Sequence, residues 1–386
     1  MNAIVLGNGG SGKAAAELLR REGWAVRILD GDDPWPNGEA CEMCVTSPGV
    51  PLGHQWQRAA RDAGLTVISE LQLGAERFRA LGGKMLAVTG SKGKSSVVKL
   101  VADALGGVAC GNYGKPLCEV AREGQLKWAV VEVSSFQMEA TTLPPDTFEA
   151  AAVLNLQEDH LDRHGSVEAY HALKRHLLDF AKVKICGESV KCCEKDVKLF
   201  AGSYFDNPVL RENGLCAVAL MRAAGLGDKA IREAFARFEP LPHRMQTVGT
   251  FGGVTWIDDS KATSLAALVA GVTMAAARGQ GDAQRVHLIA GGLPKGDDPA
   301  IALDALKKWV RRVYLIGECA TALKTAWRNT VPCEMCGTLD VAVQSATLAA
   351  KAGECVLLSP GAASFDQFRS YGERGDAFAH LACFRI

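Results

Sequence analysis

Apolar residues along this chain fall into short runs that alternate with segments of helical periodicity. In residues 84–105 the apolar run 85–88 predicts a buried strand, and the apolar positions of 95–105 recur at the spacing of a helix. Strand and helix patterns alternate in the same way elsewhere in the chain, including residues 3–30 and 254–368. This alternation predicts an α/β fold with largely parallel, doubly wound sheets.

The loop between the first of these strands and its helix is rich in glycine, lysine and serine. Backbone N–H groups of such a loop, with the positive end of the helix, cradle phosphate oxygens. Lys94 would reach the β- and γ-phosphates of ATP, and the Ser95 hydroxyl would bind Mg²⁺. Val88 stands where the strict G-x-x-x-x-G-K-[ST] pattern has its first glycine, but the strand–loop–helix context favours phosphate binding. The loop residues expected to contact ATP are Gly90, Ser91, Lys92, Gly93, Lys94, Ser95 and Ser96.

A second glycine loop lies near the start of the chain. Gly7, Gly9 and Gly12 fit G-x-G-x-x-G between a strand and a helix, and the acidic Asp30 follows about 20 positions later. Ala14 stands where a Walker loop needs a hydroxyl, so a magnesium role is excluded. NAD and a UDP-sugar are both candidate ligands, and an ordinary glycine-rich turn is the third interpretation.

Two breaks in the pattern divide the chain. Gly82-Gly83 is a linker sequence, and Pro240-Leu241-Pro242 interrupts any helix or strand. We expect a Rossmann-like domain over residues 1–82, a P-loop-type ATPase domain over 83–240 and a second Rossmann-like domain over 241–386.

Polar clusters follow several predicted strands, at the edge where ligands bind in parallel sheets. Glu132 ends an apolar strand in the sheet of the phosphate loop, the position of a Walker-B-type Mg²⁺ ligand. His160 follows another strand in company with two carboxylates, which indicates metal binding or catalysis. In the last domain, helix caps would explain the hydroxyl and acidic residues, but they do not explain the neighbouring bases Arg244, Lys261 and Lys295.

The bulk composition limits the partners. Lys+Arg and Asp+Glu are equal at 43 each, so nothing indicates binding to nucleic acid or to anionic lipid. The apolar runs are shorter than the ~18–20 residues of a membrane span, and the N-terminus has no signal-peptide pattern. The 13 cysteines are an odd number in a long chain, typical of reduced thiols. We therefore expect a cytoplasmic protein that contacts no membrane.

The ordered set of motifs resembles the Mur ligases of peptidoglycan synthesis over nearly the whole chain. The motifs are Thr89-Gly-Ser-Lys-Gly-Lys94-Ser95, Gly111-Asn112-Tyr-Gly114-x-Pro116, Glu132-x-Ser134-Ser135-Phe136-Gln137, Asn155-x-x-Glu158-Asp159-His160-x-Asp162-Arg163, Pro242-His243-Arg244 and Asp259-Ser260-Lys261-Ala262-Thr263. The tail from Ser359 to Phe368, with Arg374-Gly375, is similar to the family member that adds D-glutamate to UDP-N-acetylmuramoyl-L-alanine.

The resemblance implies an ATP-dependent amide ligase with ATP and two Mg²⁺ ions as cofactors. ATP would phosphorylate the substrate carboxylate, and the amine of D-glutamate would attack the acyl phosphate. Such a transfer needs positioning and charge neutralisation more than covalent help from the enzyme. The partners would be the two small-molecule substrates, and we expect a monomer.

The resemblance also implies a role for each matching residue. Lys94, His160, Lys174 and Lys261 would be catalytic, with Lys174 carbamylated by CO₂. The metal ligands would be Ser95, Glu132, His160 and Lys174. Asn112 and Arg244 would contact ATP, and Asp259 its ribose. The UDP part would lie on Gly10, Ser11, Asp30, Ser47, Pro48, Gly49, Ser134 and Gln137. D-Glutamate would lie on Thr263, Lys295, Ser364 and Tyr371. By its own pattern, Lys174 is typical of a solvated surface lysine.

Three departures from the family accompany the match. The region 182–213 is shorter than usual, Cys216 replaces an ATP-contacting Asn, and Tyr371 replaces a Phe. The alternatives are another ligase of the family, such as a different Mur ligase or a folylpolyglutamate synthetase, and an NAD-dependent oxidoreductase built on the Gly7 loop. A non-catalytic nucleotide-binding regulator is a further hypothesis, disfavoured by the set Lys94, Glu132 and His160.

Overall fold

The computed structural model describes residues 1–36, 40–124, 127–157, 161–190, 193–278 and 284–384, arranged around three β-sheets. Within that part of the chain, no helix is both long and apolar enough to cross a bilayer. The backbone divides into two compact units, one of residues 1–206 and 210–238, the other of 207–209 and 239–386. The expected α/β class is confirmed.

The first sheet has four parallel strands in the order β2-β1-β3-β4. Its strands are β1 (Asn2–Leu6), β2 (Ala25–Leu29), β3 (Met43–Thr46) and β4 (Val67–Ser69), and its helices are α1 (Gly10–Arg21), α2 (Gln55–Asp62) and α3 (Glu70–Ala80). Helix α1 packs close to the end of β1 because Gly12 has no side chain. A Cβ there would stand 1.9 Å from the carbonyl oxygen of Gly7. The glycines of the first loop thus permit a tight strand-to-helix turn.

The second sheet has five parallel strands in the order β6-β7-β5-β8-β9. They are β5 (Met85–Thr89), β6 (Val108–Gly111), β7 (Ala129–Glu132), β8 (Phe148–Val153) and β9 (Ala181–Cys186). The helices are α4 (Lys94–Leu105), α5 (Leu117–Glu123), α6 (Ser135–Met138), α7 (Leu161–His164), α8 (Val167–His176), α9 (Glu194–Val197), α10 (Arg211–Ala223) and α11 (Asp228–Arg237). Short 3₁₀ turns are η1 (Leu177–Phe180) and η2 (Gly187–Ser189). All residues of β5 are buried, as its apolar run predicts.

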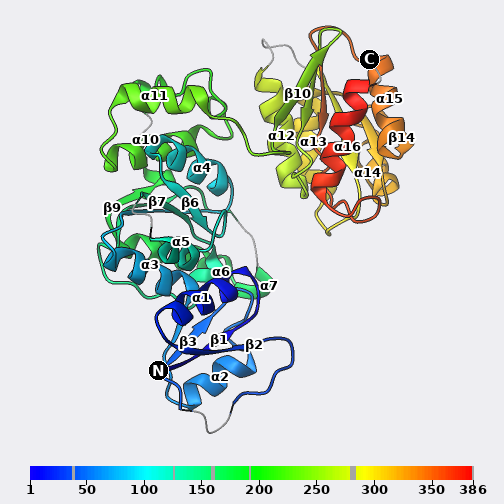
Figure 1. Cartoon of the computed structure of the whole chain (residues 1–386). Helices are drawn as coiled ribbons and strands as arrows, with labels where there is room; N and C mark the ends of the chain where they lie inside the picture. Colours follow the sequence, from blue (N-terminus) through cyan, green and yellow to red (C-terminus); the bar gives the residue numbers. More distant parts are fainter. Residues whose placement is uncertain (37–39, 125–126, 158–160, 191–192, 279–283, 385–386) are drawn as a thin grey trace. The chain divides into compact units, whose positions relative to one another are not determined.

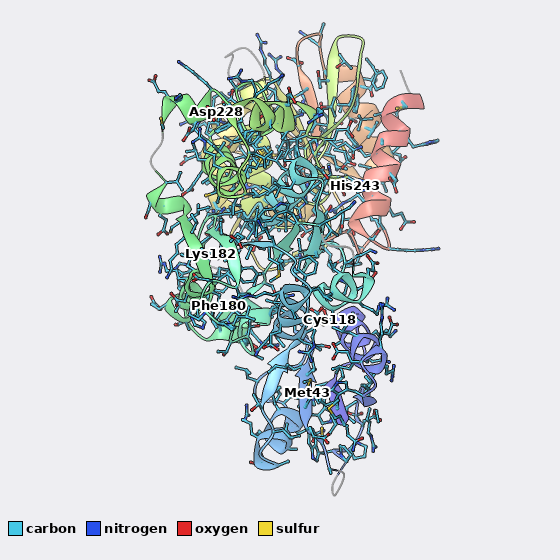
Figure 2. The ribbon with its side chains drawn as sticks, turned by 60° about the vertical axis from the view of Figure 1, so that its left-hand side comes forward. Met43, Cys118, Phe180, Lys182, Asp228 and His243 are labelled. Carbon is cyan, nitrogen blue, oxygen red and sulfur yellow. The ribbon has the colours of Figure 1, made fainter. Side chains whose placement is uncertain are left out.

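Helices cover both faces of the second sheet (Figure 1). Helix α4 packs with α10 and α11 on one face, and α5 packs with α1 and α3 on the other. One hydrophobic cluster runs from β1 through α1, α3 and α5 to β5 and Phe180, so the first two sheets share a core. Figure 2 marks Cys118 and Phe180 in this core and Met43, which packs against it. The shared core gives the first unit a single body.

The third sheet has six strands in the order β10-β11-β15-β12-β13-β14, and only β10 pairs antiparallel. The strands are β10 (Gln246–Phe251), β11 (Val254–Asp258), β12 (Val286–Gly291), β13 (Val310–Ile316), β14 (Cys333–Gly337) and β15 (Cys355–Leu358). The helices are α12 (Leu265–Arg278), η3 (Pro299–Ala302), α13 (Leu303–Trp309), α14 (Ala320–Trp327), α15 (Leu339–Ala349) and α16 (Tyr371–Phe384). Residues of α15 and α16 close a core over Trp256, Ile289 and Tyr314.

Strand β9 begins the region 182–213 that is shorter than usual in the family, and its polar sequence does not predict a strand. It pairs in parallel with β8 at the edge of the sheet. Lys182 and Lys184 point to solvent from the strand, and Ala181 and Ile185 are buried at its ends. Two lysines in six residues hide the apolar pattern of an edge strand, and charged side chains are common there.

Candidate active site

The phosphate loop joins β5 to α4 and is shaped by two glycines with positive φ. Gly90 has φ 145° and Gly93 has φ 83°, and α4 begins at the next residue, Lys94. Positive φ at these positions lets the backbone turn sharply and expose N–H groups at the helix start. The loop has the architecture of an anion site.

Two lysine ammonium groups converge on this loop. Lys94 Nζ donates to the carbonyl oxygens of Gly90 (2.7 Å) and Ser91 (3.2 Å). Lys174 Nζ, from α8, also donates to Gly90 O (3.0 Å) and lies 4.6 Å from the ring centre of Tyr170. Lys174 is only 2% exposed, so the interpretation of it as a surface lysine is wrong. Two cations beside one glycine loop favour a polyanionic ligand.

Two asparagines that sequence reasoning did not assign also hold the loop. The Asn155 carbonyl accepts from Ser91 N (2.9 Å), and its side chain accepts from Lys92 N (2.8 Å). Its Nδ2 donates to Asn213 Oδ1 (3.1 Å), and a Cβ on Gly93 would stand 2.0 Å from Asn213 Nδ2. Asn213 comes three residues before Cys216, almost one turn earlier on the same side of α10. The sequence shows that residue 213 is a polar residue, but it does not show that this residue contacts the phosphate loop.

Glu132 ends β7 directly beside the strand of the phosphate loop, paired in register with Val88. Its side chain is buried, and Oε1 accepts from Asn112 Nδ2 (2.7 Å). Oε2 is buried without a hydrogen-bond partner among the described residues. A buried carboxylate oxygen without a hydrogen-bond donor destabilises the folded protein unless a cation or a proton binds to it.

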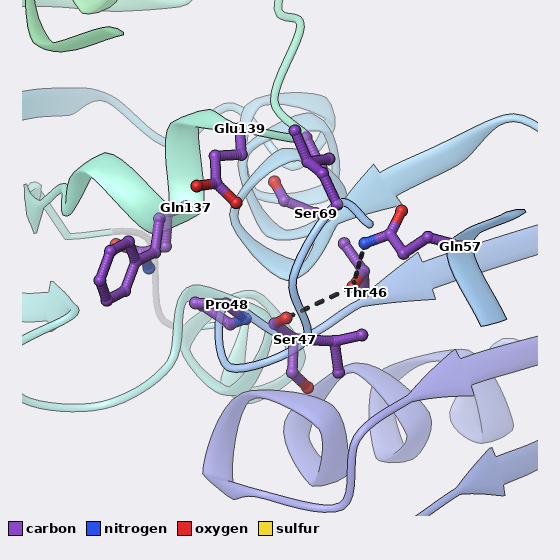
Figure 3. Close-up of a pocket in the computed structure, with 11 residues that line it drawn as sticks. Thr46, Ser47, Pro48, Gln57, Ser69, Gln137 and Glu139 are labelled. Atoms are coloured by element: carbon purple, nitrogen blue, oxygen red, sulfur yellow. Dashed lines mark hydrogen bonds between the residues drawn. The ribbon is translucent and has the colours of Figure 1, made fainter. Parts of the chain in front are cut away.

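Three residues predicted for the UDP site, Ser47, Pro48 and Gln137, line a small cavity of the first unit (Figure 3). Ser47 and Pro48 line it from the loop after β3, and Gln137 and Glu139 line it from α6 and its end. Ser47 Oγ donates to Gly7 O (3.2 Å), which joins the turn to the glycine loop. Asn8 Nδ2 lies 3.4 Å from Asp30 Oδ2. Ser134 and Gln137 form a capping box on α6, so a structural role accounts for part of their polarity.

Two further predicted residues directly follow the glycine loop. Gly10 and Ser11 are the first residues of α1, where the positive end of a helix favours anions. Gly49 lies in the turn after β3, next to Pro48. Gly10, Ser11, Asp30, Gly49 and Ser134, also predicted for the UDP site, follow β1, β2, β3 and β7 and are not among the described residues that line the cavity.

In the second unit, residues predicted to bind D-glutamate lie in loops at the carboxyl ends of the strands. Lys295 Nζ, after β12, donates to Thr263 Oγ1, after β11, over 3.1 Å. Lys261 Nζ lies 3.8 Å from the ring centre of Tyr371 at the start of α16. Ser364, in the loop after β15, is buried. Lys295 therefore contacts a hydroxyl group of the neighbouring loop, and Lys261 contacts the aromatic ring of Tyr371 in α16.

A buried guanidinium that sequence reasoning named but did not assign ties these loops together. Arg374 Nε donates to Ser260 Oγ (3.0 Å), and Nη2 donates to the carbonyls of Ser260 (3.0 Å) and Ala362 (3.1 Å). Nη1 donates to Ala363 O (3.3 Å). Burial lowers the pKa of Arg374 to about 10, so it keeps its charge at neutral pH.

Asp259 and Arg244 belong to the nucleotide-contacting set predicted for this unit. Asp259 Oδ1 accepts from Met245 N (3.2 Å) and Oδ2 accepts from Ser359 Oγ (2.8 Å). Burial raises the pKa of Asp259 to about 7, and the hydrogen bonds from Ser359 and Met245 oppose this rise. The Asp259 carboxylate in this conformation is held inside the protein and would have to exchange a partner to meet a ribose.

Comparison with known proteins identifies the family. Residues 88–187 match the family model of the Mur ligase middle domain, and residues 243–361 match that of the Mur ligase glutamate ligase domain. The chain is 33% identical over 422 residues to a UDP-N-acetylmuramoylalanine--D-glutamate ligase of Nitratidesulfovibrio vulgaris (strain DP4), covering 97% of this chain and 94% of that protein. The chain belongs to the Mur ligase family.

Further relatives and solved Mur ligase structures agree in length and fold. A protein of the same name from Chlamydia abortus is 30% identical over 428 residues, covering 98% of this chain and 96% of that one. The structure of a MurF ligase from Thermotoga maritima in complex with ADP is similar with a TM-score of 0.60 at 14% identity, covering 89% of this chain and 95% of that chain. At that identity the structural likeness concerns the fold alone.

The oxygen-bearing side chains beside the phosphate loop are suited to bind a divalent cation. The orphaned Glu132 oxygen, the Ser95 hydroxyl at the start of α4 and phosphate oxygens are the hard oxygen donors that Mg²⁺ prefers. Among the described residues no three Cys, His, Asp or Glu side chains cluster as a ready-made metal site. His160, the other predicted ligand, lies outside the described residues, as do Glu158 and Asp159.

Proposed function

We propose that the chain is the ATP-dependent ligase that adds D-glutamate to UDP-N-acetylmuramoyl-L-alanine in peptidoglycan synthesis. The observation that carries this proposal is the pair Lys94 and Lys174 on the Gly90 carbonyl, beside the orphaned carboxylate oxygen of Glu132. That arrangement suits a nucleotide triphosphate with a divalent cation. The names of the relatives, matched over nearly full length, support the amino acid and the acceptor.

The reaction has two steps. A substrate carboxylate oxygen attacks the γ-phosphorus of ATP, and ADP leaves. The amine of D-glutamate then attacks the carbonyl carbon of the acyl phosphate, loses a proton, and inorganic phosphate leaves as the amide forms. In the first step, Lys94, the loop N–H groups and the start of α4 hold the phosphates in line and offset their charge. Lys261 would lie near the reacting carboxyl group.

Magnesium, when bound, neutralises charge that develops on the transferring phosphoryl group. We assign one site to Ser95 and Glu132 and a second to His160 and a carbamylated Lys174. Lys174 is buried next to the loop, where a bare ammonium could not bind a cation but a carbamate could supply two oxygens. Asn112, which holds Glu132 Oε1, fixes the direction of the carboxylate.

We assign the amino-acid site to Thr263, Lys295, Ser364 and Tyr371. The Lys295–Thr263 bond and the Lys261–Tyr371 contact support cation and hydroxyl groups suited to the two carboxylates of glutamate. Fixing both carboxylates also fixes the direction of the amine, and that direction differs between the two enantiomers. We propose domains of 1–82 for the UDP-substrate, 83–240 for ATP and 241–386 for the amino acid.

We assign the Gly7 loop to the UDP part of the substrate rather than to NAD. The Ser47 bond to Gly7 O joins this loop to the turn at the cavity, and family membership supports the uridine nucleotide. We further propose that the protein acts as a monomer in the cytoplasm, where its nucleotide substrates are made.

The test is phosphate release from ATP with UDP-N-acetylmuramoyl-L-alanine and a panel of amino acids. D-Glutamate should support release, with L-glutamate, L-lysine and diaminopimelate at background. Activity with another amino acid would reassign the chain to a different ligase of the family. Calorimetry with the UDP compound and with NAD⁺ separates the oxidoreductase, since tight NAD⁺ binding without UDP-compound binding would contradict the proposal.

A further inference from the structure

Arg163, in α7, makes a bidentate ion pair that has no role in the reaction steps proposed above. Its Nε donates to Glu139 Oε1 (3.0 Å) and its Nη2 donates to Glu139 Oε2 (2.6 Å). The two side chains are 16% and 8% exposed, so solvent screens the pair little. This fork-to-carboxylate geometry fixes both side chains in orientation as well as in distance.

The same guanidinium reaches the first sheet. Nη2 also donates to the carbonyl oxygens of Pro48 (3.3 Å) and Val50 (3.5 Å), on both sides of Gly49. The guanidinium carbon of Arg163, Cζ, lies 4.8 Å from the ring centre of Phe136. One side chain therefore connects three segments that are distant in sequence, namely the turn after β3, the α6 segment and α7.

Glu139 and the turn line one cavity. Figure 3 shows Glu139 across from Ser47 and Pro48 on the walls of that cavity. The proposed substrate carries a diphosphate, so a bare carboxylate here would repel it. Arg163 cancels the Glu139 charge, and His164 adds a second contact, with Nδ1 3.5 Å from Glu139 Oε1 and Nε2 3.0 Å from Ser135 Oγ.

We propose that Arg163 is a positioning residue for the UDP-linked substrate, which holds the 47–50 turn in its binding conformation and neutralises Glu139 at the cavity wall. This inference rests on the proposed function, because it requires a uridine nucleotide at that turn. It assigns Arg163 no contact with the reacting atoms. Arg163 acts through the turn and through Glu139.

The test compares Arg163→Lys and Arg163→Met with the wild-type enzyme. The KM for UDP-N-acetylmuramoyl-L-alanine should rise about tenfold in Arg163→Lys, which keeps the charge but loses the fork, and about a hundredfold in Arg163→Met. The KM for ATP and the kcat should stay within about twofold of wild type. Calorimetry with the UDP compound and no ATP should show the same loss of affinity.

Removing the carboxylate as well tests the charge argument. In Glu139→Gln/Arg163→Met the KM for the UDP compound should fall back about tenfold from that of Arg163→Met, since no uncompensated buried charge remains. An unchanged KM in the double variant would overturn the neutralising role. The matched control is Arg175→Met, whose 3.3 Å pair with Glu188 is 50% and 52% exposed and should leave every constant unchanged.

The failures of the two proposals look different. If wild-type enzyme ligates D-glutamate but the KM for the UDP compound in Arg163→Met stays within twofold of wild type, or the KM for ATP rises equally, the inference about Arg163 is wrong. If wild-type enzyme ligates no amino acid but binds the UDP compound, the proposed function fails and the calorimetry still decides about Arg163. Thermal unfolding of Arg163→Lys, which keeps a cation at the site, guards against loss of the fold.

Discussion

At the scale of single residues, the phosphate loop brings two lysine ammonium groups and one buried carboxylate close to the same backbone turn. Gly90 O accepts from both Lys94 and Lys174, and the buried Glu132 stands nearby with one oxygen unpartnered among the described residues. A triphosphate would give both ammonium groups stronger acceptors than a neutral carbonyl, and a cation would satisfy Glu132. The phosphate loop is therefore suited to a highly charged ligand, which would bind the two ammonium groups more strongly than the carbonyl oxygen of Gly90 does.

Replacing Lys94 should abolish most ligation and leave the fold intact. Loss of one preorganised charge on a transferring phosphoryl group costs about 3–4 kcal/mol, or 10²–10³ in kcat. Phosphate release by Lys94→Met should fall by about that factor, with an unchanged unfolding temperature. The control is Lys99→Met on the same helix, whose side chain pairs with Asp103 at the surface and should not affect turnover. Normal turnover by Lys94→Met would remove the loop from the mechanism.

Lys174 should carry a CO₂ adduct when magnesium is present. Lys174 is buried beside the phosphate loop, where a carbamate would supply two oxygens to a bound cation. Lys174→Ala should lose most activity, and acetate or formate should restore part of it by supplying oxygens to the vacated space. Mass spectrometry or high-resolution density should reveal the adduct, and the exposed Lys182→Ala serves as control. Full activity of Lys174→Ala in CO₂-free buffer would contradict the prediction.

At the scale of elements, α3 and α5 pack unusually closely and bury a carboxyl group between them. A Cβ on Gly74 would stand 2.7 Å from Cys118 N, so the approach requires glycine. Glu70, the first residue of α3, accepts from Cys118 N through Oε1 (2.7 Å), and its Oε2 is buried without a partner among the described residues. Burial raises the pKa of Glu70 to about 7. The helix pair thus favours a protonated carboxyl group.

The stability of the first unit should consequently fall as the pH rises. The pKa of Glu70 is higher in the folded protein, at about 7, than its ordinary value of 4.5, so the folded state binds the extra proton between these values. The free energy of unfolding should decrease by roughly 1.4 kcal/mol per pH unit in that window, about 3 kcal/mol in all, and stay low above it.

Urea unfolding between pH 4 and pH 8 measures this change. Glu70→Gln, which is neutral at every pH, should remove that decline and be more stable than wild type above pH 7. Glu76→Gln, at a more exposed position of α3, should keep the wild-type slope. A wild-type stability that rises with pH through the window, with no difference in Glu70→Gln, would show that Glu70 ionises normally.

At the scale of the whole molecule, three largely parallel sheets each have polar loops at the carboxyl ends of their parallel strands. Within the second unit the loops after β11, β12 and β15 meet, and Arg374 bonds two of them from α16. Neighbouring parallel strands bring such loops to one edge whatever their distance in sequence. Specificity for an amino acid can therefore be assembled from residues a hundred positions apart.

Lys295→Met should test that assembly. Losing a cation that pairs with a substrate carboxylate should raise the KM for D-glutamate at least about tenfold and reduce the preference for D- over L-glutamate, with the KM for ATP unchanged. Steady-state kinetics with both enantiomers measure this. Lys324→Met, at an exposed position of α14, is the control. An unaltered KM for D-glutamate would place the amino-acid site elsewhere.

The sequence by itself determined the α/β class, the two glycine loops and the strand ends that carry the polar motifs. Each of these signals is local, because a strand, a tight turn and a helix start are encoded within about 20 consecutive residues. Gly90, Lys94 and Glu132 could be placed for that reason. The structure bears this out with β5 running into α4 and with Glu132 in register beside Val88.

Only the tertiary structure decided the rest, because burial and long-range contacts depend on segments that are far apart in the sequence. Lys174 has the sequence pattern of a surface residue, yet its ammonium lies on Gly90 O, 84 positions away. Asn213 meets the Gly93 loop from α10, and Arg163 reaches Pro48 across 115 positions. A polar side chain on a helix has the same local sequence pattern whether it hydrogen-bonds to water or to a distant backbone carbonyl. Only the packing of the folded chain distinguishes these two environments.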